Sequence, residues 1–224
     1  MKTLLFRAFA VIASLLGGAA VFAFLSISAG RWDIPMFMAT SIALALVVAV
    51  ASLFADSGMA MERFRPGPGG RDRFTLMASK LLMVGSLLIA GWDVGQHHWS
   101  DSVPLTLQIV SLVFFTAGIA VMEWAMVVNL FFSTLIRHQT ERGHRVVTEG
   151  PYRLVRHPGY AGAIVAMPLM GLALGSWLAA IPAFAFSLLL IRRAAIEDRF
   201  LRGELEGYDD YAARVRWRLL PGVW

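Results

Sequence analysis

Residues 137–160, RHQTERGHRVVTEGPYRLVRHPGY, form a long polar passage with apolar segments on both sides. The passage is dense in ionisable and hydrogen-bonding side chains, which are Arg137, His138, Glu141, Arg142, His144, Arg145, Glu149, Tyr152, Arg153, Arg156, His157 and Tyr160. Two rigid pairs, Gly150-Pro151 and Pro158-Gly159, punctuate it. A loop that only joined two helices would be shorter and plainer. We therefore predict an active-site segment held between apolar helices.

The composition around this segment is that of a membrane protein. Of the 224 residues, 58% are hydrophobic and only 16% are charged, whereas roughly a quarter are charged in a soluble domain. Apolar runs lie at about 4–28, 36–55, 75–92, 103–132, 159–174 and 177–191. A helix of about 20 apolar residues is long enough to cross a bilayer. The first run is longer than the core of a cleaved signal peptide, so we expect it to be a retained helix. The expected fold is all-α, a polytopic membrane helical bundle with about six transmembrane helices.

The last two runs are short and are separated only by Gly175-Ser176, which predicts a C-terminal helical hairpin. Residues 192–224 form a polar tail that ends near Pro221-Gly222. We expect an amphipathic cytoplasmic helix lying near the membrane, followed by a second short helix.

The positive charges predict an orientation. If the six runs alternate across the membrane, only Arg31 of the 20 Lys and Arg residues lies on the second side. Positively charged loops stay in the cytoplasm, so both termini and the segment 137–160 are expected there, in a bacterial inner membrane. This asymmetry also accounts for the formal charge of +5 without a nucleic-acid partner.

Several other chemistries are disfavoured. The chain has no cysteine, which excludes disulfides, thiolate metal sites and a nucleophilic thiol. Residues 65–71, RPGPGGR, lack the Lys-Ser/Thr of a phosphate loop and are expected to form a flexible surface turn. The loop after the third run carries Asp93, His97, His98 and Asp101. An interfacial loop between Trp92 and Trp99 is favoured there over a metal site, so no metal is predicted.

The hairpin determines which polar groups meet. Its two arms return the chain to one face, so Arg156-His157-Pro158 is expected beside Glu197-Asp198. Each residue alone has a simpler explanation, since Arg156 can reach lipid phosphates and Glu197 can pair with Arg193 one turn earlier. Together they predict a pocket of cations, carboxylates, an imidazole and a phenol at the membrane boundary.

The run GHRVVTEGPYRLVRHPGYAG at 143–162, with Glu197-Asp198 after the hairpin, resembles the isoprenylcysteine carboxyl methyltransferase family. That family is related to phospholipid N-methyltransferases, and its pattern is a His, Gly-x-Tyr, Arg-His-Pro-x-Tyr and a later Glu-Glu pair. The resemblance covers about residues 129–221 and is most specific at Arg156-His157-Pro158 and Tyr160. It implies an enzyme that transfers a methyl group from S-adenosylmethionine to a lipophilic or lipid-modified substrate. The acceptor classes that stay open are an isoprenylcysteine-like carboxylate, a lipid amine and a thiol.

The resemblance also implies site residues. Arg156 and Glu197 are the expected catalytic residues. The cofactor is expected to contact His144, Val146, Val147, Gly150, Tyr152, His157, Pro158, Tyr160, Glu197 and Asp198. A carboxylate suits the cofactor's ammonium or ribose hydroxyls, Arg suits its carboxylate, and the valines suit its adenine. Because Asp198 replaces the second Glu of the pattern, Glu197 is the stronger candidate.

Substrate selection is expected in residues 1–128, with 129–224 as the cofactor-binding part of a single integrated membrane domain. Glu123 and Asn129 are buried-polar candidates for that selection, although an interhelical hydrogen bond explains Glu123 equally well. Two other classes stay open at this point. One is an NADPH-dependent membrane reductase of the sterol-reductase type, which needs more basic residues for a dinucleotide phosphate. The other is a non-catalytic transporter or scaffold, although no internal repeat is present. Membrane lipids are the remaining expected partners.

Overall fold

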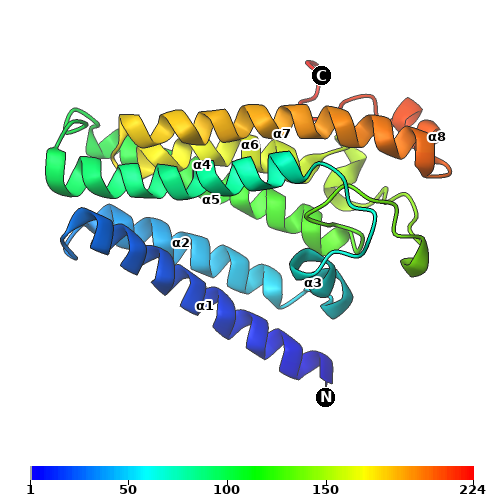
Figure 1. Ribbon diagram of the computed structural model, residues 1–224, viewed down its shortest axis with the longest axis horizontal. Coiled ribbons are helices and arrows are strands. Elements are labelled where there is room, and N and C mark those ends of the chain that lie inside the picture. Colours follow the sequence, from blue (N-terminus) through cyan, green and yellow to red (C-terminus); the bar gives the residue numbers. More distant parts are fainter. Residues whose placement is uncertain (1) are drawn as a thin grey trace.

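The computed structural model describes residues 2–224, with Lys2 described by its backbone alone, and these residues form a helical bundle without a β-sheet (Figure 1). The α-helices are α1 (Lys2–Ala29), α2 (Pro35–Ser52), α3 (Ser57–Phe64), α4 (Arg73–Trp92), α5 (Leu105–Val128), α6 (Pro158–Ala173), α7 (Trp177–Glu204) and α8 (Tyr208–Arg214). One π-helical turn, η1 (Asp93–His97), follows α4, and two 3-10 turns, η2 (Thr140–Arg142) and η3 (Gly150–Arg153), interrupt the loop before α6.

The long helices form two layers (Figure 1). The hairpin of α1 and α2 is one layer, and it packs against α4 and α5 of the other layer. In the second layer α6 lies between α5 and α7, and α4 packs on α7. The loop before α6, the helices α3 and α8, and both ends of the described chain lie at one end of the bundle, which we call the site end.

Glycines allow the close approach of α5 and α6. A Cβ atom on Gly118 would lie 2.7 Å from the carbonyl oxygen of Gly162, and one on Gly162 would lie 2.4 Å from the carbonyl oxygen of Gly118. Small residues at such a crossing bring two backbones together within a membrane. The contact fixes α6 against α5. It therefore also fixes the loop of residues 129–157 that precedes α6, which we call the site loop.

The predicted hairpin of α6 and α7 is confirmed. Gly175 turns the chain with φ at +85°, and Ser176 caps α7 by accepting a hydrogen bond from the backbone N–H of Ala179 at 3.0 Å. The Ser176 hydroxyl also donates to the fully buried carboxylate of Asp93, which accepts the backbone N–H of Ser100 at 2.9 Å. Asp93 therefore joins the α4–α5 connection to the α6–α7 turn at the far end of the bundle and has a structural role.

The remaining polar groups of that far loop are exposed. His98 pairs with Asp101 through Nδ1 at 3.3 Å, and the His97 ring stacks on Trp99. Within residues 2–224 no group of His, Asp and Glu side chains has the arrangement of a metal site.

The protein is an integral, multi-pass membrane protein, and residues 2–224 include six apolar helices of 16 residues or more. Five of them are long and apolar enough to cross a membrane, and they comprise Thr3–Ala29, Pro35–Ser52, Arg73–His97, Leu105–Val128 and Trp177–Glu204. The sixth, α6, is apolar but has only 16 residues. Helix α6 nevertheless runs to the end of the bundle opposite the site end (Figure 1). The turn at Gly175 that follows it lies against Gln108, near the start of α5.

Two boundaries differ from the prediction. Helix α5 ends at Val128, not near residue 132, because the Asn129 side chain accepts the backbone N–H of Phe131 and turns the chain. The segment 192–204 is not a separate amphipathic helix, since α7 runs without interruption from Trp177 to Glu204. The second short helix of the tail is present as α8.

The segment 65–71 is not a free surface turn. Arg71 donates its backbone N–H to the carbonyl of Ile136 at 2.9 Å, and its guanidinium lies 4.8 Å from the centre of the Phe200 ring. A Cβ atom on Gly67 would lie 2.6 Å from the Arg137 guanidinium. The missing side chain of Gly67 therefore lets the segment pack against the site loop.

Candidate active site

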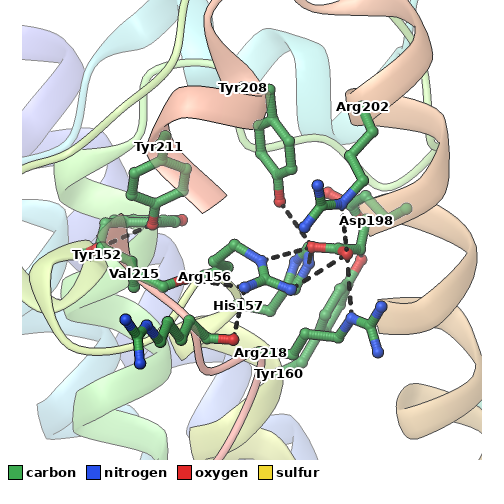
Figure 2. Close-up of polar contacts among 12 residues, drawn as sticks. Tyr152, Arg156, His157, Tyr160, Asp198, Arg202, Tyr208, Tyr211, Val215 and Arg218 are labelled. Atoms are coloured by element: carbon green, nitrogen blue, oxygen red, sulfur yellow. Dashed lines mark hydrogen bonds and ion pairs between the residues drawn. The ribbon is translucent and has the colours of Figure 1, made fainter. Parts of the chain in front are cut away.

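The hairpin brings the site loop to the end of α7, as predicted (Figure 2). Arg156, just before α6, donates from Nε to Oδ1 of Asp198 at 2.7 Å and from Nη2 to Oδ2 at 3.2 Å. The two residues are 42 positions apart, and both are buried. A two-pronged contact of this kind fixes the guanidinium plane relative to the carboxylate.

The buried carboxylate of Asp198 is a hub on which several guanidinium groups and a phenol converge (Figure 2). Besides Arg156, it accepts Nε of Arg218 at 3.0 Å, the Tyr208 hydroxyl at 3.1 Å and Nε of Arg202 at 3.4 Å. Nε2 of His157 also lies 3.4 Å from Oδ1. The side chain of Asp198 has no exposed surface, so these contacts occupy it and join α6, α7, α8 and the tail.

Arg156 holds the tail as well as Asp198. Its Nη1 donates to the carbonyl oxygens of Val215 at 2.8 Å and Arg216 at 2.7 Å. The backbone N–H groups of Arg156 and His157 donate to the carbonyls of Trp217 and Arg218, each at 2.9 Å. Four of the five guanidinium hydrogens of Arg156 are thus directed at protein acceptors.

Glu197 has a different environment from its neighbour. Its Oε2 accepts the Tyr160 hydroxyl at 2.5 Å, and that hydroxyl accepts Nε of Arg193 at 2.8 Å. Arg193 also donates from Nη2 to the carbonyl of Thr134 at 2.7 Å. Within residues 3–224, no ion pair joins Glu197 to Arg193, and Oε1 of Glu197 accepts no hydrogen bond. A charged acceptor therefore remains free, and Tyr160 sets its orientation.

Glu197 faces a cleft between the site loop and the ends of α7 and α8. The walls combine aromatic, aliphatic and polar groups, including Phe131, Phe132, Leu135, Val146, Val147, Leu201, Tyr152, Tyr208, Tyr211, His144 and Gly159. The space between its walls is about 750 Å³ when crevices and the open mouth are counted, but only about 70 Å³ of it is wide enough to admit water. Small-molecule sites usually offer roughly 300–1,000 Å³. A nucleoside-sized ligand would fit only if it extended into the mouth or displaced side chains.

Two kinds of neutral hydrogen-bonding group line this cleft. Burial lowers the pKa of His144 to about 4, with further lowering by His138, Arg137 and Arg142, so its imidazole is neutral at pH 7. The backbone N–H of Gln139 points at Nδ1 of His144 at 3.4 Å, which assigns the proton to Nε2. Burial also raises the pKa of Tyr152 well above its usual range, so that the phenol stays protonated.

Most of the predicted site residues line the cleft. They are His144, Val146, Val147, Tyr152, Arg156, His157, Tyr160 and Glu197. Gly150, Pro158 and Asp198 do not. Gly150 turns the loop with φ at +54° against Val128, and Pro158 is the buried first residue of α6. Asp198 is sealed beneath the cleft.

Other cleft groups have contacts that the sequence did not predict. Arg137 is 6% exposed and is held by Glu62 of α3, which accepts its Nε at 2.7 Å and its Nη2 at 2.8 Å. Asn129, expected to select substrate, donates to the Tyr152 hydroxyl at 3.1 Å in the cleft wall. Tyr208 and Tyr211 also line the cleft. Their spacing of three residues on a short helix places both on one face, and this spacing is a signal from which the sequence could have predicted them.

Comparison with known proteins agrees with this placement. Residues 109–202 match the model of the isoprenylcysteine carboxyl methyltransferase family, a range that begins within α5 and ends within α7. It includes the site loop, Arg156, Tyr160, Glu197 and Asp198.

Individual relatives are similar to parts of the chain. A nickel-cobalt-cadmium resistance protein of Alcaligenes xylosoxydans xylosoxydans is 32% identical over 136 residues, which are 59% of each chain. A probable protein-S-isoprenylcysteine O-methyltransferase of Oryza sativa subsp. indica is 34% identical over 112 residues, 47% of this chain and 57% of that one. Protein-S-isoprenylcysteine O-methyltransferase B of Arabidopsis thaliana is 31% identical over 70 residues, 31% and 32% of the two chains.

The matched region thus covers less than two thirds of each of these relatives. Within that region, the loop, the hairpin and the acidic pair all belong to one matched segment. The part of this chain from α5 to α7 is therefore similar to the isoprenylcysteine carboxyl methyltransferase family.

Proposed function

We propose that this protein is an integral membrane methyltransferase that transfers a methyl group from S-adenosylmethionine to a lipophilic acceptor. The observation that carries the proposal is the free Oε1 of Glu197, which faces a cleft inside the family-matched region. A fixed carboxylate at the membrane boundary suits an ammonium or a pair of ribose hydroxyls.

The donor set of the cleft fits this cofactor. Glu197 would hold its ammonium or ribose, His144 would donate a hydrogen bond from Nε2, and Val146 and Val147 would contact its adenine. The cofactor supplies an activated methyl group. The residues of the chain contribute by orienting the two reactants and by excluding water from the cleft.

Arg156 takes a positioning role in this proposal. Its guanidinium is directed at Asp198 and at two tail carbonyls, and through them it fixes the loop against α7. The catalytic role predicted for it from the family would require one of these contacts to open. Because so little of the cleft is wide enough to admit water, loop residues 129–149 would have to move outward when the cofactor enters.

We further propose that residues 1–128 select the acceptor and residues 129–224 hold the cofactor, with the cleft on the cytoplasmic side of a bacterial inner membrane. Relatives named protein-S-isoprenylcysteine O-methyltransferase support a prenylated acceptor with a carboxylate. The apolar helices beside the cleft support a lipophilic acceptor of any head group.

Calorimetry on the detergent-purified protein tests the proposal. S-adenosylmethionine and its demethylated product should bind with saturation, and NADPH should not. Tighter binding of NADPH than of S-adenosylmethionine would favour a membrane reductase. If none of the three compounds binds, a transporter or scaffold would be favoured. Methyl transfer from labelled cofactor to a farnesylcysteine analogue or to a lipid amine would then identify the acceptor class.

A further inference from the structure

A second cavity lies outside the candidate active site, between α1, α2, α3 and α5. Its walls are mainly apolar and include Phe9, Ala13, Val48, Met59 and Val127. Its volume is about 460 Å³, which is within the roughly 300–1,000 Å³ of ligand-binding cavities. None of its lining residues is shared with the cleft that contains Glu197.

Two charged side chains line this cavity without a protein partner. Glu123 of α5 is only 8% exposed, yet none of the side chains of residues 3–224 donates a hydrogen bond to it or forms an ion pair with it. Arg63 of α3 lines the same cavity, and its guanidinium likewise has no ion pair in that part of the chain. An unpaired carboxylate in an apolar helix is costly, and its presence points to a ligand.

The two charges lie near the helix ends at the site end of the bundle. Glu123 is five residues before the end of α5, or about 7–8 Å along the helix axis, and Arg63 is next to the last residue of α3. Deeper in the bundle the cavity continues between α1 and α2 along Gly17, Val21 and Leu44, where nothing lies within 4 Å of a Cβ built on Gly17. The cavity is thus charged at the site end and apolar toward the bundle centre.

We propose that this cavity binds a zwitterionic aminophospholipid. The phosphate contacts the Arg63 guanidinium, the ammonium contacts the Glu123 carboxylate, and one acyl chain lies between α1 and α2. The pairing follows from charge complementarity, because a guanidinium suits phosphate and a carboxylate suits an ammonium with N–H donors. An anionic lipid would be repelled by Glu123, and a trimethylated head group could not donate hydrogen bonds to it.

Lipid affinities of the delipidated protein in detergent test this site. Native mass spectrometry would compare phosphatidylethanolamine, phosphatidylglycerol and phosphatidylcholine. We expect phosphatidylethanolamine to bind most tightly. Glu123→Gln should lower its affinity about ten- to a hundredfold, the range of one hydrogen bond to a charged group, without weakening phosphatidylglycerol. Arg63→Gln should weaken the binding of both phosphatidylethanolamine and phosphatidylglycerol, because each carries a phosphate.

Matched controls separate this site from general membrane binding. Glu206→Gln and Arg65→Gln change exposed charges outside the cavity and should leave all three affinities unchanged. S-adenosylmethionine binding by Glu123→Gln reports that the variant is folded and tests the active site separately. Equal binding of the three lipids by the unmodified protein, or unchanged head-group preference in Glu123→Gln, would overturn the proposal.

Discussion

Two adjacent carboxylates at the end of α7 have opposite environments. Successive residues of a helix point about 100° apart, so Glu197 and Asp198 cannot face the same surroundings. Asp198 points into the protein and is enclosed by three guanidinium groups and a phenol, whereas Glu197 points into the cleft with one free oxygen. The shorter side chain holds the fold and the longer one is available to a ligand.

Glu197→Gln should weaken S-adenosylmethionine binding by about 1.5–3 kcal/mol, because it removes the charge but keeps the shape and a hydrogen-bonding oxygen. Calorimetry would measure the affinity, and thermal unfolding in detergent should show little change. Arg193→Ala is the comparison, since Arg193 touches Glu197 only through Tyr160. If both variants lose the same affinity, Glu197 is not a direct ligand.

Asp198→Asn should act on stability instead. Removing a buried charge that is paired with several cations typically costs about 3–5 kcal/mol. We expect a marked fall in the unfolding temperature, with cofactor affinity per folded molecule affected less than in Glu197→Gln. An Asp198→Asn protein as stable as the original would show that the hub contributes no net stability.

His144 should give the protein a pH-dependent stability in the acidic range. Its pKa is about 4 in the folded state, below the ordinary value of 6.5, so the unfolded chain binds more protons between those values. Its contribution to stability is therefore complete above pH 6.5 and is lost as the pH falls toward 4. Unfolding temperatures of the protein and of His144→Asn, measured from pH 7.5 to 4.5, should converge as the pH falls. Parallel curves would contradict this effect.

At the scale of elements, α3 acts as a clamp on the site loop. Both oxygens of Glu62 accept from Arg137, and Oε1 also accepts the Ser133 hydroxyl at 2.9 Å. These contacts tie a short helix from the first half of the chain to the loop that carries His144. The polar segment between α2 and α4 is therefore part of the site architecture.

Glu62→Gln should loosen this loop, because it removes a charged acceptor of two guanidinium hydrogen bonds and costs about 1.5–3 kcal/mol. Hydrogen exchange of residues 129–149 should accelerate about tenfold or more. Glu141→Gln is the matched control, since Glu141 contacts the same Arg137 from a side chain that is 54% exposed. Equal exchange in the two variants would rule out a specific clamp at Glu62.

The hairpin was predictable because it depends on local sequence. Gly175-Ser176 between two apolar runs predicts a tight turn, and the meeting of Arg156 with the acidic pair follows from that turn. The direction of each acid was not predictable in this way. The orientation of Asp198 depends on Arg218 and Tyr208, which approach from the tail.

The clamp could not be predicted for a similar reason. Glu62 and Arg137 are 75 residues apart, and the sequence around Glu62 has the composition of a polar linker. The glycines of 65–71 indicated flexibility, but their missing side chains instead make room for Arg137 and Leu135. Long-range contacts thus decided the features that local patterns left undetermined.

At the scale of the whole molecule, both ends of the described chain, α3, α8 and the site loop gather at the site end, and the turn between α1 and α2 lies at the other end (Figure 1). We predict that the site end is cytoplasmic. Because the chain has no cysteine, His98→Cys and Arg65→Cys each introduce a single exposed thiol.

An impermeant thiol reagent applied to inverted and right-side-out vesicles reports the orientation. Cys at position 65 should react only from the cytoplasmic side, and Cys at position 98 only from the opposite side. The reverse pattern would invert the topology and would place the cleft outside the cell. Reaction of both thiols from one side would contradict the membrane crossing of α4.

The tail contacts of Arg156 affect how the protein can be handled in the laboratory. The carbonyls of Val215, Arg216, Trp217 and Arg218 hold the Arg156-His157 corner, and the carbonyl of Trp224 in turn accepts the backbone N–H of Arg218. An affinity tag fused directly behind Trp224, or a truncation that removes residues 215–224, would therefore alter the cleft itself. A purification handle is better placed at the other end of the chain, because an inactive preparation tagged at Trp224 would be uninformative about catalysis.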